Sequence, residues 1–422
     1  MPASPPPLPG RTSLEVADIF RGEAASFLRD YGDSLSSQQK RVFSDIQACR
    51  TAVMGGHVDA CDQCGHRQIS YNSCRNRHCP KCQALARAEW LQQRQAELLP
   101  ISYFHVVFTV PAEIAMLAMQ NKRALYGMLF EAASQTLIEV AANPRHLGAH
   151  EIGLLAVLHT WGQNLMHHPH LHCVVSGGGL SADASRWIAC REYYFLPVKV
   201  LSRVFRGKFR ALLQRAFDRG ELGFYGDLAP LADADAFRRF LQAATKRDWV
   251  VYVKRPFHGP EVVLKYLARY THRVAISNGR LLAYRAGQVT FRYKDYAQGN
   301  KQRVTTLAAS EFIRRFLLHV LPDGFMRIRH YGYLANRHRH RKLETCRRLL
   351  GCAAPPESTS PGEQPDAAPD VNPCLAEAAP RCPVCGAGRL HTIETFERLP
   401  RHGSPPAASC APLSHAPRED SS

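Results

Sequence analysis

The stretch HHPHLHCVVSGGGL, residues 167–180, places four histidines within six positions and then continues as an apolar run that includes three glycines. Successive side chains of a β-strand point to opposite faces, so His170 and His172 share one face while Leu171 lies on the other. Pro169 restrains the backbone that enters the strand, and the glycines allow a ligand to approach the backbone closely. The stretch therefore predicts a strand that presents two imidazoles side by side.

Two imidazoles on one strand face can chelate a metal ion, although short HxH patterns also occur as ordinary core or surface histidines. The preceding predicted strand and its end supply His159, Gln163 and Asn164. We expect Gln163 to be the third ligand, with His168 as the alternative. Two imidazoles and a carboxamide oxygen leave an incompletely filled site, which suits Mg²⁺ or Mn²⁺ bound to a phosphate.

Strand and helix patterns alternate on both sides of this stretch. Strands are predicted for YFHVVFTVP (103–111), IGLLAVLHTW (152–161) and WVVYVK (249–254). Helices are predicted for residues 14–29, 37–50, 83–98, 112–142, 202–219 and 234–245. Short strands interleaved with helices indicate an α+β or α/β sandwich.

A further predicted helix, PEVVLKYLARYTHRVAISNGR (260–280), carries a pair of tyrosines. At helical spacing Tyr266 and Tyr270 are neighbours at i and i+4, on the face that also carries Arg269 and Arg273. Tyrosines grouped with guanidiniums indicate phosphate chemistry, in which a phenol that attacks phosphorus acts as a covalent nucleophile. The alternative is two half-buried surface tyrosines stacked by arginine.

The stretch CDQCGHRQISYNSCRNRHCPKC (61–82) contains two CxxC pairs separated by 14 residues: Cys61, Cys64, Cys79 and Cys82. Zn²⁺ takes four tetrahedral ligands and each CxxC turn presents two thiolates, so these four residues predict one zinc site. Cys74 and His78 lie between the pairs, which leaves open an exchange of ligands or a second shared metal. Free buried cysteines are the alternative interpretation.

A second, isolated CxxC lies near the C-terminus, in CPVCGAG (382–388). Cys382 and Cys385 have no clean second pair, and the candidate partners are Cys346, Cys352, Cys374 and Cys410. One CxxC does not complete a tetrahedron, so zinc binding there stays open. The preceding segment is rich in proline, alanine, serine and acidic residues, which is typical of a disordered linker.

Composition favours a polyanionic partner, because 54 lysines and arginines against 36 acidic residues give a net charge of +18. Nucleic acid is the leading candidate and an anionic membrane surface the rival. No run approaches the roughly 18 apolar residues of a transmembrane helix, and the start MPASPPPLPG lacks the regions of a signal peptide. In the cytoplasm that this implies, 14 cysteines indicate metal ligands rather than disulfides.

Cations interleaved with aromatic side chains predict contacts to single-stranded nucleic acid, where guanidiniums bind phosphates and rings stack on bases. The clearest such region contains His330, Tyr331 and Tyr333, and a merely solvated basic face is the alternative. The expected DNA-binding cations are Arg75, Arg77, Lys81, Arg269, Arg273, Arg314, Arg315, Arg327, Arg329 and Arg337.

These motifs, in this order, resemble the rolling-circle insertion-sequence transposases of the HUH endonuclease superfamily, in the two-tyrosine group with an N-terminal zinc-binding domain. The resemblance covers most of residues 40–345. It rests on the cysteine stretch, the histidine stretch, YLARYTHRVAISNGRL and FIRRFLLHVLPDGFMRIRHYGYLANRHR (312–339). It implies a ferredoxin-like or RRM-like palm of antiparallel strands with flanking helices, in which the histidine strand is central.

The resemblance also implies that His170 and His172 bind the Mg²⁺ or Mn²⁺ and that Tyr266 and Tyr270 are the paired nucleophiles. The implied activity is nicking and joining of single-stranded DNA at transposon ends through a 5′-phosphotyrosine, followed by transfer to target DNA in the bacterial cytoplasm, at the nucleoid. A replication initiator or relaxase of the same superfamily is one alternative. A non-catalytic, zinc-dependent DNA-binding protein is the other.

The expected division of the chain follows from these motifs. It comprises a disordered start at 1–12, a zinc-binding and DNA-binding domain at 13–98, a catalytic domain with an arginine-rich block at 99–345, a disordered linker at 353–381, and a tail with the second CxxC at 382–422.

Overall fold

The computed structural model describes residues 14–83, 90, 97–191, 195–257, 262, 275–295, 299, 301–352 and 379–399. Most of the predicted tyrosine helix, most of the helix expected at 83–98, the N-terminal segment and residues 353–378 lie outside them. The chain divides into a large unit, Met1–Cys49 with Cys74–Asp370, and a small unit, Arg50–Ser73 with Val371–Ser422. No helix of the described residues is long and apolar enough to cross a membrane.

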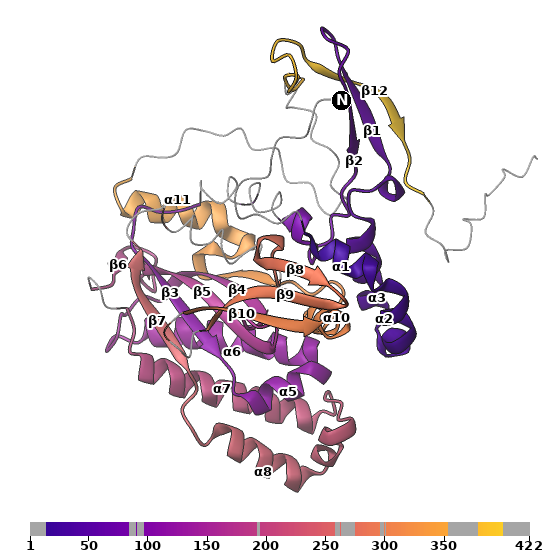
Figure 1. Cartoon of the computed structure of the whole chain (residues 1–422). Helices are drawn as coiled ribbons and strands as arrows, with labels where there is room; N and C mark the ends of the chain where they lie inside the picture. The colour runs from indigo at the N-terminus through magenta and orange to yellow at the C-terminus, as the bar shows by residue number, and fades with distance from the viewer. Residues whose placement is uncertain are drawn as a thin grey trace, which may run out of the picture. The chain divides into compact units, whose positions relative to one another are not determined.

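The large unit is built on a six-stranded sheet in which every pairing is antiparallel (Figure 1). The strand order is β11 (Ile328–Tyr331), β4 (Glu151–Trp161), β5 (His167–Leu180), β3 (Tyr103–Thr109) and β7 (Val251–Phe257), with the short β6 (Trp187–Ala189) paired to β5. The histidine stretch is β5, and it pairs with both β4 and β3. The expected antiparallel palm with a central histidine strand is confirmed.

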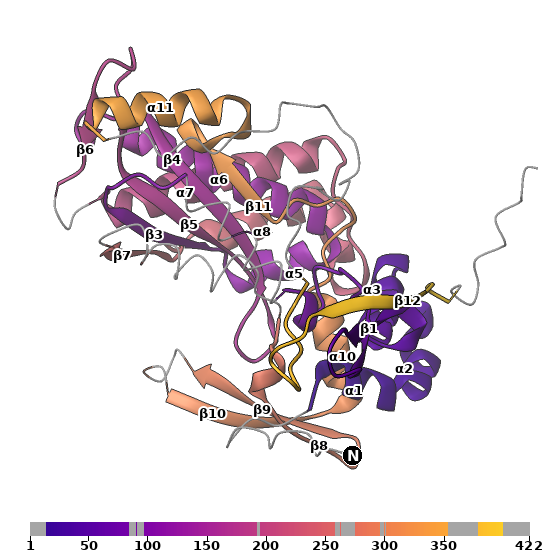
Figure 2. The ribbon, with the colours of Figure 1, turned by 90° about the horizontal axis from the view of Figure 1, so that it is seen from above.

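The two faces of the sheet differ because side chains alternate along each strand. On β5, Leu171, Cys173 and Val175 are buried in the largest core, whereas His170 and His172 face the other way. Helices α5 (Ala112–Gln120), α6 (Lys122–Ala142) and α7 (Val198–Asp218) cover the apolar face, and α8 (Ala234–Thr245) packs against α7 (Figures 1 and 2). The histidines therefore lie on the face away from these helices.

Helix boundaries follow local capping more closely than the hydrophobic pattern predicts. The single helix expected at 112–142 ends and restarts at Asn121, whose side-chain amide donates to the carbonyls of Leu117 and Gly223 at 3.3 and 2.8 Å. The helix expected at 14–29 is likewise divided into α1 (Val16–Gly22) and α2 (Ala24–Tyr31). These breaks let each helix meet the core at its own angle.

A second core of the large unit joins the N-terminal helices to a later part of the chain. It contains α1, α2, α3 (Ser37–Ala48), β8 (Leu281–Arg285), β9 (Gln288–Asp295) and α10 (Ala309–Leu318), and β10 (Lys301–Ala308) completes the sheet. Phe20 lies at its centre, with ring centroids 5.1 Å from Phe43 and 5.3 Å from Phe316. The N-terminal helices thus share a core with residues 281–318. The last helix of the unit is α11 (Arg339–Leu349).

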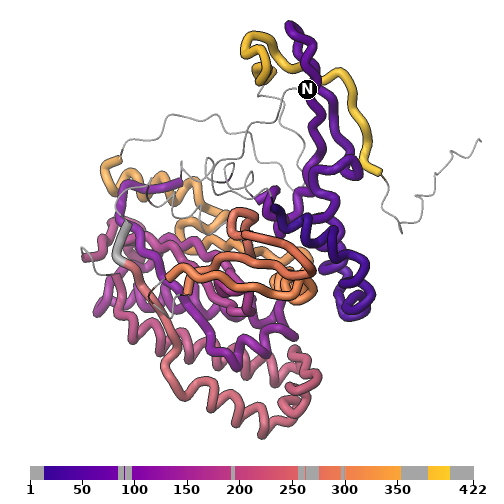
Figure 3. The backbone as a smooth tube through the Cα atoms, viewed as in Figure 1, coloured from indigo at the N-terminus to yellow at the C-terminus, as the bar shows by residue number. Residues whose placement is uncertain are grey.

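The small unit is a three-stranded antiparallel sheet in the order β12 (Leu390–Phe396), β1 (Gly56–Cys61), β2 (Arg67–Tyr71). β12 comes from the expected tail, yet it pairs with β1 from Gly56 opposite Phe396 to Cys61 opposite Leu390, and the tube in Figure 3 shows the two segments running together. Segments from opposite ends of the sequence therefore build one sheet.

Candidate active site and metal centres

Three histidines converge on the open face of the palm. His159 of β4 and His170 of β5 are direct partners in the strand register, and His172 follows on the same face. One ring nitrogen from each of the three lies within 4.8 Å of the others, and the Nε2 atoms of His170 and His172 are 3.1 Å apart. Imidazole nitrogens gathered in this way form a donor set that fits a divalent transition-metal ion.

Hydrogen bonds orient two of these rings. Nδ1 of His170 lies 2.7 Å from the backbone oxygen of His168, and Nδ1 of His172 lies 2.8 Å from Nε2 of His105. An Nδ1–H that donates leaves Nε2 without a proton and therefore available to a metal. With Nδ1 as the donor in each ring, both Nε2 atoms offer lone pairs to a metal ion.

His105 is a fourth member of the site that the sequence did not reveal. It lies in the middle of β3, is only 2% exposed, and reaches His172 diagonally across the strand pair. Burial, with a smaller contribution from the charge of Lys254, lowers the pKa of His105 to about 3 and keeps the ring neutral. A single histidine in YFHVVFTVP looks like an ordinary core residue, and only the register with β5 distinguishes it.

The structure offers a second candidate for the third ligand beside Gln163, whose assignment stays a prediction. Gln163 lies in the turn after β4, where its backbone carbonyl accepts a hydrogen bond from Arg280. His159 instead stands opposite His170, is 2% exposed, and stacks on Trp161 at 4.8 Å between ring centroids. The alternative, His168, contributes its backbone oxygen to the orientation of His170. The geometry favours His159 because it is the residue that the strand register brings to His170.

The expected nucleophiles, Tyr266 and Tyr270, lie outside the described residues, together with Arg269 and Arg273. Their assignment stays a prediction. The described chain stops at β7 and resumes at Ala275, apart from Val262, so the tyrosine segment directly follows the strand that pairs with β3.

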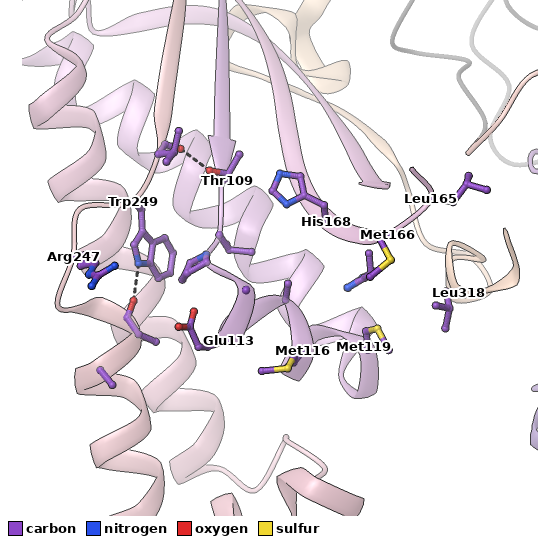
Figure 4. Close-up of a pocket in the computed structure, with 18 of the residues that line it drawn as sticks. Thr109, Glu113, Met116, Met119, Leu165, Met166, His168, Arg247, Trp249 and Leu318 are labelled. Carbon is purple, nitrogen blue, oxygen red and sulfur yellow. Dashed lines mark hydrogen bonds between the residues drawn. The ribbon is translucent and has the colours of Figure 1, made fainter. Parts of the chain in front are cut away.

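A cavity of about 950 Å³ lies at the start of β5, where His167 and His168 line it (Figure 4). Thr109, which is opposite His170 in the strand register, lines it together with His168. Figure 4 shows Met116, Met119 and other lining side chains from α5, the β4–β5 turn and the segment after α8. The cavity wall combines the thioethers of Met116 and Met119 and the ring of Trp249 with cationic side chains. The lysines and arginines that line it are Lys246, Arg247, Arg314 and Arg315.

The cysteines form two clusters, and their members differ from the expected zinc set. In the large unit the clustered residues are Cys49, Cys74, Cys79 and Cys82, and their sulfurs lie within 4.8 Å of one another. Cys82 Sγ is 3.6 Å from Cys49 Sγ and 3.5 Å from Cys74 Sγ. Sulfurs bound tetrahedrally to zinc at 2.3 Å are about 3.8 Å apart, so this cluster fits Zn²⁺. Cys74 is a member, as the sequence allowed, and Cys49 was missed.

Cys61 and Cys64 belong to the other cluster, with Cys382 and Cys385, in the small unit. The expected grouping with Cys79 and Cys82 is wrong because β1 pairs with β12, which directly follows the C-terminal CxxC loop. His78 takes no part in either cluster; it is buried, and its Nε2 accepts a hydrogen bond from the backbone N–H of Leu321 at 3.5 Å.

Two of the expected DNA-binding cations support the fold. Arg77 is half-buried and donates to the backbone oxygens of Phe325 and Pro322 at 2.5 and 2.9 Å. Arg327 is buried beside Gln83, and burial lowers its pKa to about 10. A guanidinium enclosed by protein cannot contact a phosphate in the solvent, so the expectation for Arg327 is wrong. Arg77 is half-buried, and a DNA contact by this residue stays a prediction.

The other described cations differ in exposure. Arg75 and Arg337 are exposed, while Lys81 lies 2.6 Å from Glu15 Oε2. Arg314 and Arg315 share the carboxylate of Glu311, each at 2.6 Å, and still line the cavity at the start of β5. The guanidinium of Arg329 lies 4.3 Å from the ring centroid of Phe130. DNA contacts by these residues stay predictions.

Comparisons with known proteins agree with this arrangement. Residues 153–342 match the family described as "Putative transposase", and residues 19–110 match the "Transposase zinc-binding domain". The first range contains His159, His170 and His172, and the second contains the whole cysteine cluster of the large unit. No solved structure matches the chain.

Two relatives align over nearly the whole chain. "Putative transposase y4qJ" of Sinorhizobium fredii is 57% identical over 389 residues, which is 92% of this chain and 96% of the relative. The "Transposase for insertion sequence element IS801" of Pseudomonas savastanoi pv. phaseolicola is 28% identical over 400 residues, 93% of each chain. The protein therefore belongs to the transposase family that joins a zinc-binding domain to this palm, as the order of its motifs implied.

Proposed function

We propose that this transposase is an HUH-type endonuclease and strand transferase that nicks and joins single-stranded DNA at the ends of its element. The observation that carries the proposal is the convergence of His159, His170 and His172 on the central strands of an antiparallel sheet. A site of this kind holds a metal at a solvent-accessible face, where a phosphate can complete the coordination. The predicted nucleophiles follow β7 in the chain, two strands from β5.

The proposed chemistry is two transesterifications. The phenol oxygen of Tyr266 or Tyr270 forms a bond to phosphorus, the bond from phosphorus to the 3′ oxygen breaks, and the 3′ oxygen leaves as a hydroxyl. The 5′-phosphotyrosine keeps the energy of the phosphodiester, so a later attack by a 3′-hydroxyl rejoins DNA without another energy source. A divalent ion held by the imidazoles supplies Lewis-acid stabilisation of charge on the phosphate. The second tyrosine would cleave the second strand.

The cavity at the start of β5 suits unpaired nucleotides. Its thioethers offer adaptable apolar contacts to bases, and Arg314 and Arg315 add positive charge for the backbone. Bases inside a duplex are stacked and could not enter such a space. This argument favours a single-stranded substrate over a double-stranded one.

The test is a cleavage assay with purified protein, Mn²⁺ or Mg²⁺, and labelled oligonucleotides from the DNA that flanks the gene. We expect a covalent adduct on single strands, its loss with EDTA or in His170→Ala, and its loss or reduction in Tyr266→Phe or Tyr270→Phe. Tyr225→Phe, at an exposed tyrosine, is the matched control. Duplexes of the same sequence test strand specificity.

A folded, zinc-loaded protein that binds these oligonucleotides but forms no adduct with either flank would overturn the proposal. That result would support the non-catalytic, zinc-dependent DNA-binding protein. Adducts formed equally on duplex and single strand would retain the nuclease and reject the strand specificity.

A further inference from the structure

The small unit contains four thiols placed as metal ligands. Cys61 Sγ lies 3.7 Å from Cys385 Sγ, and Cys64 Sγ lies 3.7 Å from Cys382 Sγ. All four sulfurs are within 4.8 Å of one another, and all four cysteines are free. A disulfide would bring two sulfurs to about 2.05 Å, whereas tetrahedral zinc holds them about 3.8 Å apart. The observed spacing is that of a metal site.

The two CxxC loops have the same backbone conformation. In the first loop, the N–H of Gln63 donates to Cys61 Sγ at 3.4 Å, and the N–H of Gly65 donates to the Cys61 carbonyl at 3.2 Å. In the second, the N–H of Val384 donates to Cys382 Sγ at 3.4 Å, and the N–H of Gly386 donates to the Cys382 carbonyl at 2.9 Å. Gly65 and Gly386 both have φ of 67°, a conformation that glycine adopts without strain. Two matched loops facing each other indicate a built site.

Backbone geometry around the second loop also suits a metal-bound sulfur. The N–H of Gly388 donates to Cys385 Sγ at 3.4 Å. Gly388 is needed at this point, because a Cβ atom there would collide with Cys61 Sγ and the Asp62 carboxylate. The loops approach each other as closely as glycine permits.

The described part of the small unit has little apolar core. Its buried cluster consists of Cys61, Cys382 and Leu390, and Met54 is buried apart from that cluster. Most side chains of β1, β2 and β12 are exposed or half-buried, and Ile69 and Ile393 are more than half exposed. A sheet of this size cannot offset its conformational entropy with so little burial and needs a covalent or metal cross-link. The thiols supply that cross-link only if an ion joins them.

We propose that Cys61, Cys64, Cys382 and Cys385 bind a second structural Zn²⁺ that holds the C-terminal segment onto the β1–β2 hairpin. Four thiolates in a closed tetrahedron are the usual ligands of structural zinc and leave no position for a substrate. Each thiol releases its proton as it binds the ion. Cys61 and Cys64 lie within the match to the zinc-binding domain, whereas neither family match includes residues 382–385. Half of the ligands therefore come from a segment outside both matches, and the site does not depend on the nuclease chemistry.

The first test is the zinc content of the purified full chain by mass spectrometry. We expect two zinc ions per chain, and one in the double variant Cys382→Ser/Cys385→Ser. The matched control Cys190→Ser/Cys352→Ser changes two cysteines outside both clusters and should retain two zinc ions. Cobalt substitution checks the ligands, because the thiolate-to-cobalt absorption should fall by about half in the tail variant. A tail variant that keeps two zinc ions would overturn the proposal.

A second test does not depend on the variant's folding. A specific protease site is inserted in residues 353–378, the segment predicted to be a linker, and the full chain is cut under native conditions. The C-terminal fragment should remain bound in gel filtration and should leave when Cys61 and Cys64 are changed to serine. A fragment that leaves the unmodified chain in the presence of zinc would also reject the site. Adduct formation in the cleavage assay is scored separately, so failure of one proposal does not imply failure of the other.

Discussion

His105 positions His172 through one hydrogen bond between ring nitrogens, at 2.8 Å. Removing such a partner from a metal-bound histidine typically lowers metal affinity by about 10- to 100-fold. We expect that loss for Mn²⁺ in His105→Ala, with partial recovery in His105→Gln, whose amide can still accept the hydrogen bond. Isothermal titration measures the affinity, and His150→Ala, at an exposed histidine, is the control. Equal affinity in wild type and His105→Ala would leave His105 as a core residue only.

Substitution of each candidate third ligand distinguishes His159, which the strand register favours, from Gln163, which the sequence predicts. If His159 is the ligand, His159→Ala should lose Mn²⁺ binding at the palm while Gln163→Ala retains it. Three imidazoles also bind Mn²⁺ more tightly than Mg²⁺, which prefers oxygen ligands. We therefore expect cleavage to need less Mn²⁺ than Mg²⁺. Loss of Mn²⁺ binding in Gln163→Ala alone would restore the original assignment.

At the level of single residues, the sequence predicted those features of the site that depend on one strand alone. His170 and His172 share a face because side chains alternate, and that rule needs no partner strand. His159 and His105 join them through the register of β4 and β3 against β5, which depends on pairing between segments far apart in the chain. Nothing in the local sequence around His159 or His105 indicates its role in the site.

Helix α1 is held to α3 and α10 by the packing of Phe20, which is fully buried between Phe43 and Phe316. Replacing a buried phenylalanine with alanine costs about 3 to 5 kcal/mol. We expect Phe20→Ala to lower the free energy of unfolding of the large unit by that amount in urea titrations. Leu28→Ala, at an exposed position of α2, should cost much less. A small loss in Phe20→Ala would mean that the N-terminal helices fold apart from residues 281–318.

The end of α10 is joined to the β4–β5 turn by His319. Its Nε2–H donates to the Leu165 carbonyl at 3.0 Å, and its Nδ1 lies 3.3 Å from Thr160 Oγ1. Burial lowers the pKa of His319 to about 3, against about 6.5 in the unfolded chain. Between these values the unfolded state binds a proton that the folded state does not, so stability falls as pH decreases from about 6.5 and is unaffected above it.

His319→Gln should reduce the slope of the free energy of unfolding against pH. The reduction is at most the contribution of one proton, about 1.4 kcal/mol per pH unit within that window. Urea titrations at several pH values between 4 and 8 measure the slope. Other buried histidines with lowered pKa values, such as His78 and His167, should maintain the rest of the acid sensitivity. An identical slope in wild type and variant would show that His319 protonates without unfolding.

Elements with strong local patterns were predicted well, and those that depend on distant partners were not. The strands β3, β4 and β5 and the helices α7 and α8 lie close to the predicted segments, because apolar spacing and β-branched content are local properties. β12 and the sheet β8–β10 were missed. The side chains of β10 and β12 are largely exposed, so no apolar periodicity marks these two strands. β8 and β9 bury only Leu281, Val289 and Phe291, a short apolar pattern, and all of these strands are held by pairing with other strands.

Across the whole molecule, the excess of positive charge predicts binding of single strands that weakens steeply with salt. Each phosphate contact that is lost lowers the slope of log K against log salt by about 0.7. Arg337 is exposed, and Arg337→Ala should show that change with similar loss for every oligonucleotide sequence. Arg203→Ala, on the exposed side of α7, is the control. Fluorescence anisotropy at several salt concentrations measures this slope. An unchanged slope in Arg337→Ala would remove Arg337 from the DNA contacts.

The zinc ligands show why domain organisation was the hardest property to predict. Spacing alone groups Cys61, Cys64, Cys79 and Cys82, because nearby CxxC pairs usually share an ion. The chain instead completes one cluster with Cys49, just before the small unit begins, and the other with a CxxC near its opposite end. Each cluster includes cysteines outside the two nearby CxxC pairs, so local spacing does not reveal either ligand set.

The separation of these ligands along the chain has a consequence for synthesis of the protein on the ribosome. The sulfurs that meet in the small unit are 318 and 324 positions apart, which at about 5 to 20 residues per second is roughly 15 to 65 s of translation. During that interval Cys61 and Cys64 stand beside Cys79 and Cys82 in the nascent chain, the very set that local spacing favours. Correct metal loading thus depends on the order in which ligands emerge, and a gene copy interrupted after the palm would yield a chain with two unmatched thiols.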